Sequence, residues 1–215
     1  MSESNGDTNG DTNGMTDYIV VSIKAGICQL LPEDLVQNGV QYLRIRTEDF
    51  DLEQCRSLIL HWQTMRAKHH LAIGLILEWN GQNLPKSKGS HTEPLLWHPN
   101  AVPPEFKQQI LMAQSLEIDC ICLSHLQDPE SIAVLKLCLE ACGSQAKVLV
   151  RPLLKMTSLR LAAMIHAADG VLLSSEDFSS QEEAESTEAN YRWITQECRR
   201  TGVPMYICVQ RSGTN

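Results

Sequence analysis

Ala168-Asp169-Gly170-Val171-Leu172-Leu173-Ser174-Ser175-Glu176-Asp177-Phe178 is the stretch that says most about the fold of this chain. Its centre is a short run of apolar side chains with no polar residues between them, which is typical of a strand buried on both faces of a parallel sheet. Acidic residues follow directly, at Glu176 and Asp177. The stretch therefore predicts a buried strand that carries an acidic residue at its carboxyl end.

The same alternation of short apolar runs and amphipathic segments extends over most of the chain. Apolar runs predict seven strands, at residues 18–23, 42–45, 71–77, 120–123, 147–150, 171–174 and 205–209. Apolar residues spaced three and four apart predict six helices between them, at residues 32–38, 52–67, 104–116, 129–142, 158–167 and 181–201. This order indicates an α/β protein, either an open doubly wound sheet or a (β/α)₈ barrel that stops after about seven parallel strands.

The domain organisation follows from where this alternation is absent. Residues 1–16 contain a near-repeat of Asn-Gly-Asp-Thr and almost no apolar side chain, so we expect a disordered polar tail. Residues 17–210 form one expected domain, interrupted at residues 78–103 by an irregular connection rich in glycine and proline. Residues 211–215 are expected to be a second, short tail.

Composition disfavours several classes of protein. The 215 residues carry a formal net charge of −8, which argues against a nucleic acid as partner. No run of eighteen apolar residues is present and the N-terminus is polar, so we expect no membrane span and a cytoplasmic protein. The eight cysteines lack the paired spacing of a zinc site or a disulfide framework, and are expected to be reduced and mostly buried.

Four segments of the chain, taken in order, match motifs of one enzyme family. Tyr18-Ile-Val-Val-Ser-Ile23 is similar to an opening K-I-V-C-T-I strand, and Gly39-Val-Gln-Tyr-Leu-Arg44-Ile to G-M-N-V-A-R-L. Ala168-Asp169-Gly170 followed by Glu176-Asp177 is similar to an S-D-G strand that ends in R-G-D-L, and residues 203–210 to K-P-V-I-C-A-T-Q. Residues 17–210 thus resemble the first seven strands of the barrel domain of pyruvate kinase.

The resemblance implies a reduced version of that enzyme. Residues 78–103 stand where the family inserts a mobile lid domain and are too few to form one. The eighth barrel strand and the C-terminal regulatory domain of the family have no counterpart. The expected architecture is therefore a truncated (β/α)₈-type barrel without lid or regulatory domain.

Three retained residues are the candidate site that the resemblance implies. Pyruvate kinases move a phosphoryl group from phosphoenolpyruvate to ADP with the help of Mg²⁺, K⁺, lysine and arginine. Arg44 stands at a phosphate-contacting arginine of the family, and Arg151 at its phosphate-contacting lysine. Asp177 stands at one of the two carboxylates that hold Mg²⁺. Arg44 and Arg151 are thus vestigial catalytic residues, and Asp177 is a vestigial metal ligand.

Other functional positions of the family are replaced. Leu153 stands at the second Mg²⁺ carboxylate, and Val209 at a threonine beside the proton-transfer site. Ser175-Glu176 replaces the R-G whose amides hold the substrate carboxylate. The positions of the K⁺ ligands carry an unrelated set of side chains, namely Arg46, Glu48, Ile76 and Leu77. A purely structural explanation stays open, in which Arg44 and Asp177 pair with other charges at the barrel mouth or Asp177 caps the last helix.

Three functions follow as alternatives. The first is a pyruvate kinase-like protein that has lost catalysis, needs no cofactor and acts by binding a homologue or another partner. An unfinished barrel would leave unpaired edges at its first and seventh strands, through which the chain could also self-associate. The second is a weakly active pyruvate kinase that uses Arg44, Arg151 and Asp177 with Mg²⁺ and K⁺. The third is a fragment of a degenerating gene with little function.

Overall fold

A closed barrel of seven parallel strands forms the centre of the molecule. The structure is a computed structural model that describes residues 17–23, 31–83, 104–174, 177 and 184–209. Each strand pairs in parallel with its neighbours in the chain, and the last strand pairs with the first. The strands are β1 (Asp17–Ser22), β2 (Tyr42–Arg46), β3 (Gly74–Asn80), β4 (Cys120–Ser124), β5 (Lys147–Val150), β6 (Gly170–Ser174) and β7 (Met205–Val209).

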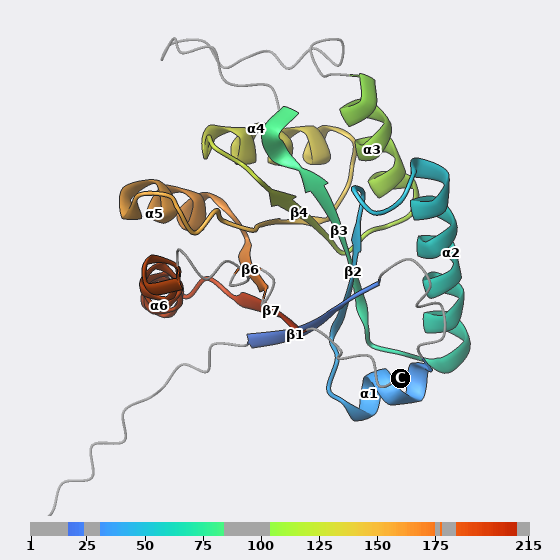
Figure 1. The fold of residues 1–215 in the computed structure, drawn as a ribbon. Coiled ribbons are helices and arrows are strands. Elements are labelled where there is room, and N and C mark those ends of the chain that lie inside the picture. The colour runs from blue at the N-terminus through green and yellow to red at the C-terminus, as the bar shows by residue number, and fades with distance from the viewer. Residues whose placement is uncertain (1–16, 24–30, 84–103, 175–176, 178–183, 210–215) are drawn as a thin grey trace, which may run out of the picture.

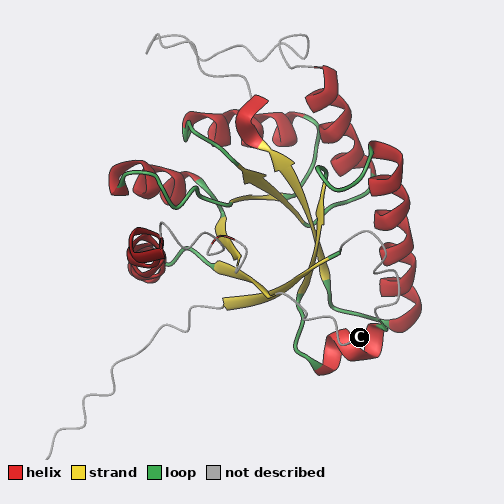
Figure 2. Cartoon of the chain, viewed as in Figure 1, coloured by secondary structure: helices red, strands yellow, loops and turns green. Residues whose placement is uncertain are grey.

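Helices alternate with these strands and lie on the outside of the barrel (Figures 1 and 2). Within the described residues they are α1 (Pro32–Gln37), α2 (Leu52–His69), α3 (Pro104–Ser115), α4 (Glu130–Ala141), α5 (Ser158–Ala167) and α6 (Ala184–Thr201). A short 3₁₀ helix, η1 (Gly81–Asn83), follows β3. This arrangement confirms the predicted α/β fold with a truncated (β/α)₈-type barrel, and excludes the open doubly wound sheet.

The closure of the barrel corrects one expectation. β1 and β7 pair in parallel, from Asp17 beside Met205 to Val21 beside Val209. Every strand in the described part of the chain therefore has a neighbour on both sides. The predicted open edges at the first and seventh strands are wrong, and so is self-association through them, because their backbone groups are already paired.

The third strand begins and ends later than predicted. The amide of Leu71 donates to the carbonyl oxygen of Arg66, so Leu71 belongs to the end of α2 rather than to a strand. Glu78 to Asn80 complete β3 and η1 follows, so the expected irregular connection over residues 78–103 is wrong for its first six residues. Its remainder, the predicted tails at 1–16 and 211–215, and the predicted helix start at 181–183 lie outside the described residues.

Side chains that alternate along the strands divide the core into two parts. Outward-facing residues such as Leu43, Leu75 and Ile121 pack against the helices in the larger core cluster. Inward-facing residues such as Ile76 and Leu149 fill the lumen of the barrel in a second cluster. Both faces of the strands are therefore apolar, which is why the sequence shows continuous apolar runs.

The lumen of an eight-stranded barrel is just wide enough for side chains to fill it, and a seven-stranded barrel is narrower. Large side chains therefore fit in this lumen only beside small residues. Tyr18, Tyr42 and Tyr206 pack together with ring centroids 4.7 to 5.3 Å apart. A Cβ atom on Gly74 would lie 2.3 Å from the ring of Tyr42, and one on Gly170 would lie 2.6 Å from the ring of Tyr206. These glycines therefore leave the space that the tyrosines occupy.

The cysteines act as small apolar residues in the same setting. Cys120, Cys122 and Cys208 are buried and belong to the cluster in the lumen. Burial raises the pKa of Cys120 to about 12, so its thiol stays protonated. All described cysteines are free and all but Cys142 are buried, which agrees with the expected reduced, mostly buried thiols, while Cys28 lies outside the described residues.

Five helices end in a residue with left-handed backbone conformation. Glycine fills this position after α1, α4 and α6, at Gly39, Gly143 and Gly202. After α2 and α3 the position is occupied by His70, with φ 51°, and by Glu117, with φ 46°. A side chain with a Cβ is disfavoured there, so these two helix ends carry backbone strain that the other three avoid.

This difference predicts opposite effects of two substitutions. Gly143→Ala should lower the free energy of unfolding by about 1 kcal/mol, because φ is 74° and only the backbone conformation is unfavourable, with no atom within 4 Å of the new Cβ. His70→Gly should raise it by about 0.5–1 kcal/mol. Urea unfolding of both variants measures these changes. If both substitutions raised the free energy of unfolding, or both lowered it, the assignment of backbone strain to His70 would be contradicted.

Candidate functional site

Four charged side chains meet at the carboxyl end of the barrel. Arg44 lies on β2 and Glu78 on β3, Arg151 directly follows β5, and Asp177 follows β6. The alternation along β2 and β3 turns Arg44 and Glu78 toward the lumen, on the same face as Ile76. These four residues are called the charge network below, and they lie at the end of a (β/α) barrel where active sites are found.

The charges of the network alternate in sign along a chain of hydrogen bonds. Arg44 Nε donates to Glu78 Oε2 at 2.5 Å, and Arg151 Nη1 donates to Glu78 Oε1 at 3.1 Å. Arg151 Nη2 and Nε both donate to Asp177 Oδ1, at 2.6 and 3.1 Å. The other oxygen of Asp177 accepts from the backbone amide of Ser174 at 3.2 Å. One carboxylate, Glu78, is therefore shared between two guanidinium groups.

Burial makes these interactions stronger than ion pairs on a surface. The side chains of Arg44 and Glu78 are 0% and 2% exposed, whereas Arg151 and Asp177 are 12% and 18% exposed. Burial alone would raise the pKa of Glu78, but the two guanidinium groups outweigh it, so that this pKa is lowered. Burial likewise disfavours charge on Arg44, and Glu78 reverses this effect and raises the pKa of Arg44.

The network also reaches the strands that close the barrel. Arg44 Nη1 donates to Ser22 Oγ on β1 at 3.1 Å and to Cys208 Sγ on β7 at 3.4 Å. Ser22 Oγ and Cys208 Sγ are themselves 3.2 Å apart. Arg44 thus ties the pairing of β1 with β7 to the carboxylate on β3.

The three residues proposed from the sequence come together, but each has an opposite charge as its partner. Arg44 pairs with Glu78, and Asp177 pairs with Arg151. Asp177 Oδ2 accepts from the amide of Ser174 at the end of β6, whereas the described part of α6 begins seven residues later, at Ala184. The geometry is that of the structural alternative, in which Arg44 and Asp177 pair with other charges at the barrel mouth.

The positions at which the family binds K⁺ do not form an oxygen site. Arg46 pairs with Glu48, with Nη2 and Oε2 at 2.9 Å, and lies 3.7 Å from Asp49. Ile76 faces the lumen and Leu77 faces the helices, both fully buried. Arginine and two aliphatic side chains at these positions leave no set of oxygen ligands for a monovalent cation.

The resemblance implies that Val209 lies beside the candidate site, but its side chain is on the outer face of β7. It pairs with Val21, whose side chain packs in the outer core cluster, and it is 40% exposed. Its neighbour Cys208 is the residue of β7 that faces the lumen and Arg44. The missing hydroxyl at Val209 therefore has no bearing on the charge network.

Glu78 lies at the centre of the site, but the sequence prediction does not include it. The predicted irregular connection begins at Glu78, whereas this residue lies within β3. The signal was present, because Glu78 is the one charged residue between Leu71 and Asn80. A charge inside an apolar strand is almost never fully buried unless it is paired, so its presence indicates a partner of opposite charge.

The residues at the mouth do not fit a Mg²⁺ ion. Both oxygens of Asp177 accept hydrogen bonds, from Arg151 and from Ser174, and the guanidinium of Arg151 would repel a cation. The position of the second carboxylate is Leu153, which has no oxygen in its side chain. Among the described residues no group of three or more His, Cys, Asp or Glu side chains could hold a metal ion.

No family model matches the chain, and no curated protein matches it either. None of the helices in the described ranges combines the length and the apolar character needed to cross a membrane.

The shared carboxylate predicts a large loss of stability when it is neutralised. Glu78→Gln should lower the free energy of unfolding by about 3–5 kcal/mol, because it leaves the buried charge of Arg44 without its partner. Glu188→Gln is the matched control, since it removes an exposed pair with Arg192 on α6 and should cost less than about 0.5 kcal/mol. Denaturant unfolding measures both, and similar small effects would contradict the role of Glu78.

The same carboxylate predicts a dependence on pH. Because the folded state lowers the pKa of Glu78, its ion pairs stabilise the protein above the unfolded pKa of about 4.3, and this contribution is lost as the pH falls through the folded value. The difference in unfolding free energy between wild type and Glu78→Gln should therefore be constant near neutral pH and shrink below about pH 4. A difference that grows on acidification would contradict this sign.

Proposed function

We propose that this chain is a pyruvate kinase-like barrel that no longer transfers phosphoryl groups and acts by binding a homologue or another protein. The observation that carries the first half of the proposal is the charge network, in which Glu78 and Asp177 neutralise Arg44 and Arg151. A pyruvate kinase homologue is proposed as the partner because the motifs between Asp17 and Gln210 resemble those of that family.

Phosphoryl transfer depends on uncompensated positive charge at the reacting phosphate. The two guanidinium groups and the two carboxylates of the network sum to zero charge. A phosphate entering the mouth would have to displace Asp177 from Arg151, where the carboxylate is held by contacts of 2.6 and 3.1 Å. Substrate binding would thus compete with an interaction already present within the chain.

The weakly active enzyme remains the second candidate because Arg44, Arg151 and Asp177 do meet at the carboxyl end of the barrel. In that function Asp177 would have to exchange Arg151 for Mg²⁺. The two candidates therefore differ in the partner of one carboxylate.

An assay of turnover separates these candidates. With phosphoenolpyruvate, ADP, Mg²⁺ and K⁺, and with pyruvate followed through lactate dehydrogenase, we expect no rate above that of the mixture without protein. Asp177→Ala should behave like wild type in this assay. Turnover that requires Mg²⁺ and disappears in Asp177→Ala would establish the enzyme and overturn the first half of the proposal.

Removal of Asp177 should also create an anion site. Asp177→Ala leaves Arg151 and the amide of Ser174 without the carboxylate that they bind. Inorganic phosphate should then raise the melting temperature of the variant in a saturable way, and that of wild type much less. The double variant Asp177→Ala with Arg151→Met is the control and should not respond. An equal response of wild type would show that Asp177 does not block the mouth.

The binding half of the proposal has a separate test. Mixed with a full-length pyruvate kinase, the protein should enter a larger species in analytical ultracentrifugation and change the turnover of that enzyme. The pairing of β1 with β7 leaves helix and loop surfaces, rather than strand edges, as the region of contact. A monodisperse monomer that neither co-sediments with the enzyme nor alters its rate would contradict this partner.

A further inference from the structure

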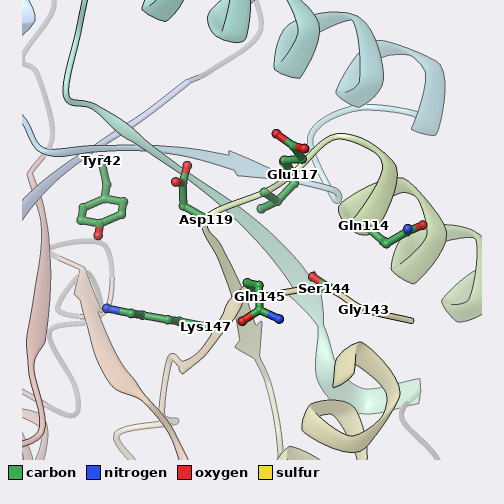
Figure 3. A pocket seen from close by; sticks show the side chains of 9 residues that line it. Tyr42, Gln114, Glu117, Asp119, Gly143, Ser144, Gln145 and Lys147 are labelled. Carbon is green, nitrogen blue, oxygen red and sulfur yellow. The ribbon is translucent and has the colours of Figure 1, made fainter. Parts of the chain in front are cut away.

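A depression lies at the opposite, amino-terminal end of the barrel. This depression, of about 620 Å³, opens between the loop from α3 to β4 and the loop from α4 to β5. Figure 3 shows the side chains around it, which include Tyr42, Gln114, Glu117, Asp119, Gln145 and Lys147. Its volume lies within the range of about 300–1,000 Å³ that is usual for small-molecule sites.

The charges at this depression are arranged differently from those of the charge network. Asp119 already has partners within the chain, because its Oδ2 accepts hydrogen bonds from Arg66 Nη1 at 2.8 Å and from the amide of Leu75 at 2.7 Å. Lys147 and Glu117 are exposed and form no ion pair or hydrogen bond with any side chain in the described part of the chain. One free cation and one free carboxylate therefore line the same depression.

The two free charges lie on different sides of the depression. Figure 3 draws the ammonium group of Lys147 on the side of Tyr42, and the carboxylate of Glu117 on the other side of Asp119. The ring of Tyr42, half-buried against Tyr18 and Tyr206, offers an apolar surface beside Lys147. The carboxyl ends of α3 and α4 lie at the same loops and add partial negative charge.

Glu117 occupies its position at a cost in stability. It has φ 46° at a helix end where α1, α4 and α6 carry glycine. Glycine would relieve about 1 kcal/mol of backbone strain there. Strained backbone is found more often at binding and active sites than elsewhere, and here it lies beside the depression that Glu117 lines.

We propose that this depression binds a small extended molecule with an α-amino acid carboxylate at one end and a guanidinium group at the other, the chemistry of free arginine. The ligand carboxylate meets Lys147, the guanidinium meets Glu117, and the aliphatic part lies along Tyr42. The amides of Gln114 and Gln145 supply further hydrogen-bond donors and acceptors. This site is independent of the function proposed for the barrel mouth.

Calorimetry with three related molecules tests both charges of the ligand. L-arginine should bind the wild-type protein, whereas L-citrulline, which has a neutral ureido group in place of the guanidinium, and agmatine, which lacks the carboxylate, should each bind at least tenfold more weakly. Equal affinities for the three molecules, or no binding of arginine, would overturn the proposal.

Matched variants assign each charge to its residue. Lys147→Gln should remove the preference for arginine over agmatine, and Glu117→Gln the preference for arginine over citrulline. Lys107→Gln, which changes an exposed lysine of α3 outside the depression, should leave all three affinities unchanged. Affinities for arginine within twofold of wild type in both of the first two variants would also overturn the proposal.

Glu117→Gly separates binding from folding. It should raise the melting temperature in the absence of ligand, because it removes the left-handed strain, and it should still lose the binding of arginine. A Glu117→Gly protein that is more stable and binds arginine as wild type does would show that Glu117 plays no part in the site.

Discussion

The carboxylate of Glu78, shared between Arg44 and Arg151, is the interaction on which the carboxyl end of this barrel depends. Seven strands enclose a narrow lumen, so few water molecules can reach a charge placed there. Each buried charge must then find its counterion within the chain, since an unpaired one would be very costly. The network meets this requirement and also joins β3 to the seam between β1 and β7 through Arg44, Ser22 and Cys208.

The same neutralisation is the basis of the function proposed for the barrel mouth. A catalytic site for phosphoryl transfer needs positive charge that is not already paired, so that it can bind the substrate phosphate. Here Arg151 is paired with Asp177, and the side chain of Leu153 has no oxygen that could bind a metal ion. At the amino-terminal end, Lys147 and Glu117 carry charges that form no ion pair with any of the residues that the structure describes. The charges of the network, at the end of a barrel where active sites are ordinarily found, are paired within the chain.

Local features of this fold could be predicted from the sequence, and long-range ones could not. Apolar runs gave β5 and β7 with their observed bounds, because such runs depend only on neighbouring residues. The pairing of β1 with β7 joins residues that are 188 positions apart, as Val21 and Val209 are, and periodicity carries no information about it. The motifs predict Arg44, Arg151 and Asp177, but not their partner Glu78, because the apolar run that predicts the third strand ends at Leu77. The outward orientation of Val209 likewise depends on strand register, which no motif records.

The central claim, that the barrel mouth is occupied by its own charges, is tested most directly by a crystal structure of the protein grown with Mg²⁺ and phosphoenolpyruvate at saturating concentrations. The account predicts that Arg151 remains paired with Asp177 and Glu78, and that neither metal nor substrate is bound among them. A Mg²⁺ ion coordinated by Asp177, with Arg151 turned toward a bound phosphate, would contradict it.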